Sequence, residues 1–156
     1  MRLLGSYGFA VTTWQIEPDA TALPAGDGVV ICGPKSSPAA AALLAQDPEL
    51  VLSEDAGRWQ ITERRSGQRY RSPADSEEPV PADIAYVGRH HESGWVTVHI
   101  AGIHAISSLG AVHYLTANLA DLFTQTDEAS FSLVTEAAYD GLTITGSRLL
   151  AGPFPW

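Results

Sequence analysis

The sequence predicts an α/β fold, because strand patterns and helix patterns alternate along its 156 residues. Twice, a short apolar strand runs through a glycine-containing loop into a helix, over residues 28–46 and residues 95–124. Segments between and after these two units predict β-hairpins. Two strand–loop–helix units favour a three-layer, Rossmann-like sandwich with a mixed sheet of about six or seven strands and added β-hairpins. The alternative is a half-open β-barrel with helices at its ends.

The first unit starts with the apolar run GVVIC at residues 28–32 and continues through the loop GPKSSP. Alanines and leucines follow, which favour a helix interior. Ser36 or Ser37 can cap this helix, and Pro38 suits its first turn. The helix is expected to end at Asp47, since the residue before a proline is driven out of helical geometry.

The second unit contains the longest helix signal in the chain. Residues 95–101 alternate between two bulky faces, which predicts a central strand covered on both sides. The loop GIHAISSLG follows, in which Ser107 or Ser108 is expected to cap the helix. Apolar residues then recur at helical spacing and are expected to face the core. They are Leu109, Val112, Leu115, Leu119, Leu122 and Phe123.

Three further pairs of segments predict hairpins, and one segment predicts a loop. The hairpins pair 58–62 with 68–72, 84–90 with 95–101, and 131–138 with 142–150. The stretch SPADSEEPVPA, at residues 72–82, has proline and acid without periodicity and is expected to be a loop. The whole chain, residues 1–156, is therefore expected to form a single α/β domain.

Acidic residues outnumber basic residues by 18 to 9, which gives the chain a net charge of −9. That balance argues against direct nucleic-acid binding, because clustered lysine and arginine are what grip a phosphate backbone. Cys32 is the only cysteine, which excludes an internal disulfide and a cysteine-rich zinc site. The sequence shows no signal peptide and no apolar run long enough for a membrane span. A cytoplasmic protein without membrane contact is therefore expected.

The two loops that connect strand to helix are the candidate ligand site. If their strands are parallel neighbours, both loops leave the same edge of the sheet, where α/β proteins bind ligands. Helix N-termini carry partial positive charge and free N–H groups, which suit phosphate or carboxylate. The candidate ligand-binding residues are Gly33, Pro34, Lys35, Ser36, Ser37, Gly102, His104, Ser107 and Ser108.

Neither loop carries a specific nucleotide-binding motif. GPKSSP lacks the spacing of a Walker A sequence and is not GxGxxG. Lys35 is the only lysine and could meet an anionic group, or it could be an exposed loop residue beside a helix-capping serine pair. No pattern identifies a cofactor, and no HxH or HExxH pattern predicts a metal site.

His104, Asp83 and Glu136 are the candidate catalytic residues. His104 could donate to a ligand oxygen or act as a general acid or base, or it could simply bond to backbone. Glu136 lies in the apolar strand FSLVTEAA, where it could be catalytic or a surface charge on an edge strand. His99 is expected to be a core residue, and His90 is expected to be solvated at a turn.

Three segments in order, VVICGPKSSP, DIAYVGRH and VHIAGIHAISSLGAVHYL, resemble a domain of bacterial, chiefly actinobacterial, helix-turn-helix regulators. In those regulators the domain follows the DNA-binding part. The segments are also similar to stand-alone Rossmann-like domains with a Gly-Gly-Pro loop and a second loop of Ala-Gly-(Ile/Cys)-His-Gly type. The resemblance covers residues 1–150, and its matching positions are Gly33, Pro34, Lys35, Ser36, Gly102, His104 and Gly110.

The resemblance implies a ligand-sensing domain, and the chain itself shows no helix-turn-helix. A fused or separate DNA-binding domain is therefore an expected partner. By analogy of fold, Rossmann-like nucleotide sensors and NAD-cleaving domains suggest a nucleotide-like ligand.

Three functions remain open at this point. The first is a regulatory sensor that binds a small anionic or nucleotide-like ligand. The second is a hydrolase acting on NAD, a nucleotide or an N-glycosidic bond, which needs a carboxylate at the two loops. The third is a protein-interaction or homodimerisation module that uses a sheet edge and the C-terminal GPFPW, with Phe154 and Trp156 exposed.

Overall fold

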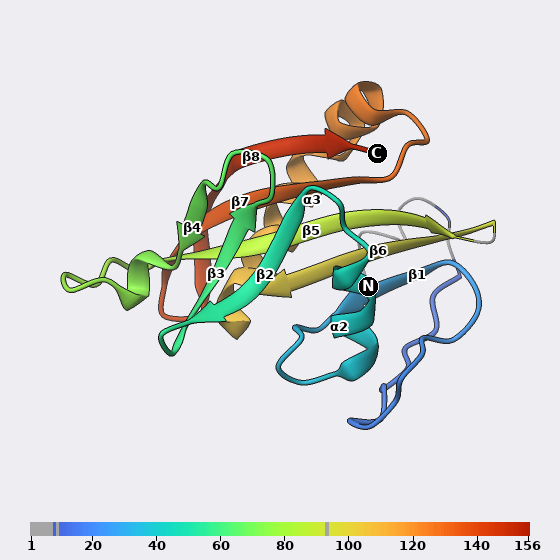
Figure 1. Cartoon of the computed structure of the whole chain (residues 1–156). Helices are drawn as coiled ribbons and strands as arrows, with labels where there is room; N and C mark the ends of the chain where they lie inside the picture. The colour runs from blue at the N-terminus through green and yellow to red at the C-terminus, as the bar shows by residue number, and fades with distance from the viewer. Residues whose placement is uncertain (1–7, 9, 93) are drawn as a thin grey trace.

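Figure 1 shows the computed structural model, which describes residue 8, residues 10–92 and residues 94–156. Its elements, in chain order, are β1 (Gly28–Ile31), α2 (Pro38–Ala45), β2 (Leu50–Asp55), β3 (Arg58–Glu63), β4 (Arg69–Arg71), the 3₁₀ turn η1 (Pro73–Asp75), β5 (Ala82–Glu92), β6 (Trp95–Gly102), α3 (Ala105–Thr126), β7 (Phe131–Asp140) and β8 (Thr143–Pro155). Neither described helix is both long and apolar enough to cross a membrane.

The strands form two sheets, so the fold is mixed α/β. The large sheet has five strands in the order β1-β6-β5-β7-β8, and the small sheet has three in the order β2-β3-β4. In the large sheet β1 and β6 are parallel, and all other neighbours are antiparallel. The three expected hairpins are confirmed as β3–β4, β5–β6 and β7–β8.

The expectation of one sheet with about six or seven strands is wrong. Residues 50–55, for which no strand was expected, form β2 and pair with β3 through a two-residue turn. Ala56 and Gly57 in this turn have φ of 51° and 78°, and two positive φ values are what a type I′ hairpin turn needs. The resulting three-stranded sheet packs against the large sheet face to face instead of extending its edge.

The large sheet is covered on both faces, and the two cores lie on either side of it (Figure 1). The core under α3 includes Val87, Ile100, Tyr114, Leu115, Leu122 and Leu133. The core under the small sheet includes Leu44 of α2 together with Leu50, Leu52, Ile61, Ile84, Tyr86 and Val134.

The two helices start differently. At α2 the expectation is confirmed, because Ser37 Oγ accepts a hydrogen bond from the Ala40 N–H and Pro38 is the first helical residue. At α3 the expected serine cap is wrong, since the helix already starts at Ala105 and His104 is its N-cap residue. Asp83 on β5 replaces the serine, because its Oδ2 accepts a hydrogen bond from the His104 backbone N–H at 3.1 Å.

Candidate functional site

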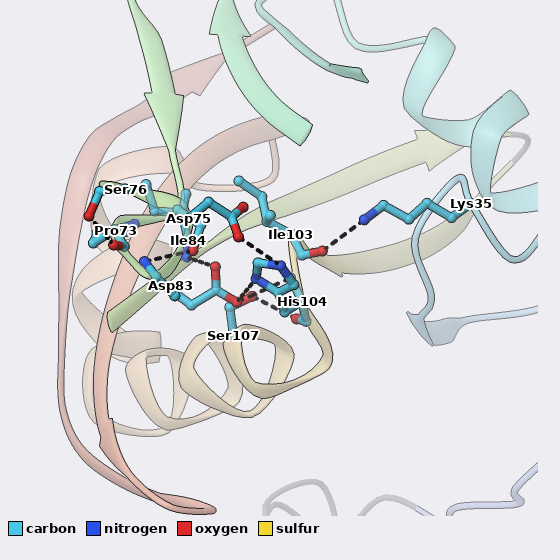
Figure 2. A network of polar contacts seen from close by, with 11 residues as sticks. Lys35, Pro73, Asp75, Ser76, Asp83, Ile84, Ile103, His104 and Ser107 are labelled. Atoms are coloured by element: carbon cyan, nitrogen blue, oxygen red, sulfur yellow. Dashed lines mark hydrogen bonds and ion pairs between the residues drawn. The ribbon is translucent and has the colours of Figure 1, made fainter. Parts of the chain in front are cut away.

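The loops after β1 and β6 lie together at one edge of the large sheet. This follows from the parallel pairing of the two strands, in which Ile31 lies opposite Ile100. Lys35 Nζ crosses between the loops and donates a hydrogen bond to the Ile103 carbonyl at 3.2 Å, as Figure 2 shows. A pocket of about 280 Å³ opens here, lined by Lys35, Gly57, Arg58, Trp59, Asp75, Ile103 and His104.

His104 is held between two carboxylates (Figure 2). Its Nδ1 lies 3.3 Å from Asp83 Oδ2, and its Nε2 lies 3.4 Å from Asp75 Oδ1. Asp83 is fully buried, and its Oδ1 also accepts the Ile84 N–H at 2.8 Å. The imidazole itself is 44% exposed and faces the pocket. The buried Asp83 carboxylate at one ring nitrogen fixes the orientation of the imidazole, and Asp75, at the other nitrogen, lines the pocket together with His104.

Two cations and an aromatic ring form the opposite side of the pocket. Lys35 Nζ lies 4.8 Å from the centre of the Trp59 ring, which is cation–π distance. Arg58 has no ion-pair partner among the described residues. By contrast, Arg65 pairs with Glu49, and the arginines at 69 and 71 both pair with Asp55. Arg58 is therefore free to meet an anion.

The β2–β3 turn places Arg58 and Trp59 at the pocket. Ala56 in that turn has a positive φ, which costs a residue with a side chain roughly 1–2 kcal/mol. The type I′ turn itself requires this conformation, which fixes where the next residues, Arg58 and Trp59, begin β3.

Several of the other residues predicted for ligand binding make hydrogen bonds within the protein, close to the site. Ser37 caps α2, Ser107 Oγ donates to the His104 carbonyl, and Ser108 Oγ accepts the Gly102 N–H. A Cβ on Gly102 would lie 2.3 Å from the His104 carbonyl oxygen, so the loop needs a glycine there. Outside the pocket lining lie Gly33, Pro34, Ser36, Ser37, Gly102, Ser107 and Ser108.

Glu136 is not part of this pocket. It lies on β7, and its Oε1 accepts from Arg148 of the neighbouring β8 at 2.6 and 2.8 Å. β7 is flanked by β5 and β8, so Glu136 is a paired charge on an inner strand and not an edge residue. Of the carboxylates considered from sequence, Asp83 is the one that reaches His104.

The sequence analysis missed Arg58, Trp59 and Asp75. Asp75 had a signal, because Ser72, Pro73 and an acid two residues later are the start pattern of a helical turn. The structure forms that turn as η1, with Ser72 Oγ accepting the Ala74 N–H. The sequence carried no signal for Arg58 and Trp59, because the residues around a hairpin turn do not show which surface the turn packs against.

A second polar cluster is buried beneath the small sheet. His99 is fully buried, as expected, and its Nε2 donates to the Cys32 carbonyl at 2.8 Å. Burial lowers the pKa of His99 to about 4. Its neighbour Tyr86 contacts His90 at 3.2 Å, and burial beside Asp47 raises the pKa of Tyr86.

His90 corrects one expectation, because it is 4% exposed and not solvated. Its ring makes an edge contact with Trp156, at 5.7 Å between ring centres. Phe154 likewise packs against the core under the small sheet. The GPFPW segment is thus mostly the end of β8. The expected exposure is confirmed for Trp156, which is 37% exposed, and is wrong for Phe154, which is half-buried.

No family model, curated protein or solved structure matches the chain. Within residue 8 and residues 10–92 and 94–156, no group of three or more His, Cys, Asp or Glu side chains could hold a metal ion. What the pocket can bind follows from its own side chains.

Proposed function

We propose that the pocket between the two loops binds a small anionic ligand and that the chain is a ligand-sensing domain. One observation carries the proposal. In a chain with a net charge of −9, Lys35 and Arg58 come from separate segments to line one pocket, and Arg58 has no other described ion-pair partner. Cations that line a concave site without a carboxylate partner attract phosphate or carboxylate.

The pocket also suggests how such a ligand lies. A phosphate or carboxylate faces Lys35 and Arg58, while Asp75 accepts from a hydroxyl group of the ligand. The volume of about 280 Å³ is just below the usual range of small-molecule sites, which is about 300–1,000 Å³. A sugar phosphate or a mononucleotide fragment fits this description better than a whole dinucleotide.

The fold type and the partner belong to the same proposal. A parallel strand pair with a helix after each strand is the ligand-binding edge of Rossmann-like sheets, and β1–α2 and β6–α3 have that form. A regulatory role in the cytoplasm, with a fused or separate DNA-binding domain, agrees with the resemblance described above.

Calorimetric titration with ribose 5-phosphate, AMP and inorganic phosphate tests the proposal. Lys35→Ala and Arg58→Ala should each weaken binding by about 1.5–3 kcal/mol, the scale of a hydrogen bond to a charged group. Arg65→Ala is the matched control, since Arg65 lies on the same small sheet but pairs with Glu49 outside the pocket. Equal affinity in all three variants, or no binding of any probe, would contradict the proposal.

A hydrolase is the second candidate, and the Asp83–His104 contact favours it. In that function His104 removes a proton from water as the water attacks a phosphate ester or an N-glycosidic carbon, and the leaving group departs with the bonding electrons. His104→Ala separates the two functions. It changes affinity alone in a sensor, whereas it lowers turnover at saturating substrate in an enzyme.

A further inference from the structure

The outer face of α3 exposes large apolar side chains. The helix packs against the large sheet through one side, which buries Tyr114, Leu115 and Leu122. On the other side Leu109, Leu119 and Phe123 are 53%, 38% and 56% exposed. The expectation that these three residues face the core is therefore wrong. Contiguous exposed apolar side chains mark protein interaction sites.

The spacing of the stripe indicates that its partner is a helix. Leu109, Val112, Thr116, Leu119 and Phe123 follow one another at separations of three, four, three and four residues, and Val112, which is half-buried, also contacts the core under α3. This is the repeat of a coiled-coil seam, where one helix packs its side chains between those of another. Over these positions the stripe is about 21 Å long, at 1.5 Å per residue.

The charge distribution on α3 allows a second copy of the chain as the partner. Asp121 is the only Asp, Glu, Lys or Arg in α3, and it lies about a third of a turn away from the stripe. Two molecules that each carry a net charge of −9 repel one another over most of their surface. The α3 face lets them approach without placing acids opposite acids, and it offers a basic partner nothing to pair with.

The two ends of the stripe are equally far from its centre. Leu109 and Phe123 are each seven residues from Thr116, whereas Val112 has Ala120 and Leu119 has His113 as the counterpart at the same distance from Thr116. An antiparallel pair of α3 helices around a two-fold axis at Thr116 therefore brings Leu109 against Phe123 of the second copy. The same axis brings Val112 against Ala120, and self-complementary patches of this kind form two-fold dimers.

The centre of the stripe suits close approach of two helices. Thr116 and Ala120 are small, and the Thr116 hydroxyl already donates to the Val112 carbonyl at 2.8 Å. The threonine therefore brings no unpaired polar group into an apolar contact. We propose that the protein forms a homodimer in which the outer faces of two antiparallel α3 helices pack together. This inference does not depend on the ligand.

Sedimentation velocity over a wide concentration range tests the dimer. The double variant Leu109→Glu/Phe123→Glu should change the mass in solution from dimer to monomer, with an unchanged circular dichroism spectrum. Leu142→Glu is the matched control, because Leu142 is 86% exposed in the β7–β8 turn and lies outside the stripe. A wild-type monomer at every concentration, or a dimer that survives the double variant, would overturn the proposal.

Disulfide cross-linking tests the antiparallel arrangement in a Cys32→Ser background, which has no other cysteine. Under mild oxidation Thr116→Cys should form a covalent dimer, since the two-fold axis brings this position next to itself. Thr124→Cys is the control, being exposed on the same helix but off the stripe. The arrangement is refuted if Thr124→Cys cross-links as readily as Thr116→Cys.

Discussion

His99 and His104 are five residues apart in the sequence, yet their surroundings are opposite. His99 lies within β6, is fully buried, and donates to the Cys32 carbonyl. His104 follows β6, is nearly half exposed, and faces a pocket with a carboxylate on each side. The side chains around His99 are packed away from solvent, so the polar groups there stabilise the fold. The second keeps cations and an imidazole open to solvent, which is what binding requires.

The largest expected effect is a loss of stability in acid that arises at His99. Its pKa is near 4 in the folded protein and 6.5 when unperturbed, so the unfolded chain binds more protons between these values. Stability is therefore full above pH 6.5 and falls as the pH drops, by about 3 kcal/mol near pH 4. Urea unfolding across this range measures the loss.

His99→Gln isolates that effect, because a glutamine amide can still donate to the Cys32 carbonyl but does not titrate. The variant should show a shallower dependence of unfolding free energy on pH than the wild type. An unchanged slope would show that other groups, such as His90, whose pKa burial also lowers, control the acid sensitivity.

Gly88→Ala should be the next largest effect. A Cβ at this position would lie 2.2 Å from Tyr86 Oη and 2.9 Å from His90 Nε2, so the buried cluster has to move. Overpacking of this kind costs about 2 kcal/mol. Gly146→Ala on β8, where a Cβ meets nothing within 4 Å, is the control for thermal unfolding. Equal melting temperatures in the two variants would count against a tightly packed cluster.

At the pocket, Ala56→Asn should change stability in the other direction. Asparagine tolerates positive φ better than alanine, and Asn-Gly is the preferred pair for a type I′ turn. We expect a gain of about 0.5–1 kcal/mol in the free energy of unfolding, with binding of the anionic probes retained. Destabilisation by this substitution would mean that the turn does not have the described geometry.

Lys35→Ala should have the smallest effect on folding. The side chain is exposed, and its hydrogen bond to Ile103 and its cation–π contact with Trp59 are each worth about 1 kcal/mol or less at an exposed site. Its melting temperature should stay within the error of the wild type while its affinity for phosphate compounds falls. A marked loss of stability would assign Lys35 to the fold and not to the site.

The comparison of the two histidines also shows how far sequence could go. Alternation and β-branched runs predicted the hairpins, and the position of two loops after apolar strands predicted that Lys35 and His104 would share an edge. Within the small sheet the β3–β4 hairpin was predicted, but β2 and the separation from the large sheet were not, since β2 has no strong pattern and the docking of the small sheet is decided by tertiary packing. The pocket includes Arg58, Trp59 and Asp75 only because the small sheet and η1 lie next to the edge of the large sheet that carries the loops after β1 and β6.

The helix α3 illustrates a different limit. Its apolar residues surround much of the helix, so periodicity could place a helix over 109–122 but could not say which side meets the sheet. The start of α3 was missed for a similar reason. The group that bonds to the His104 N–H is Asp83, which is far away in the sequence.

Chemical-shift mapping with ribose 5-phosphate tests the central claim most directly. Titration should shift the Trp59 indole N–H and the His104 ring signals, together with the backbone amides of Lys35 and Arg58. The signals of the buried His99 cluster should stay unchanged. Shifts confined to other surfaces, or identical shifts in a Lys35→Ala/Arg58→Ala variant, would contradict the assignment of this pocket as an anion-binding site.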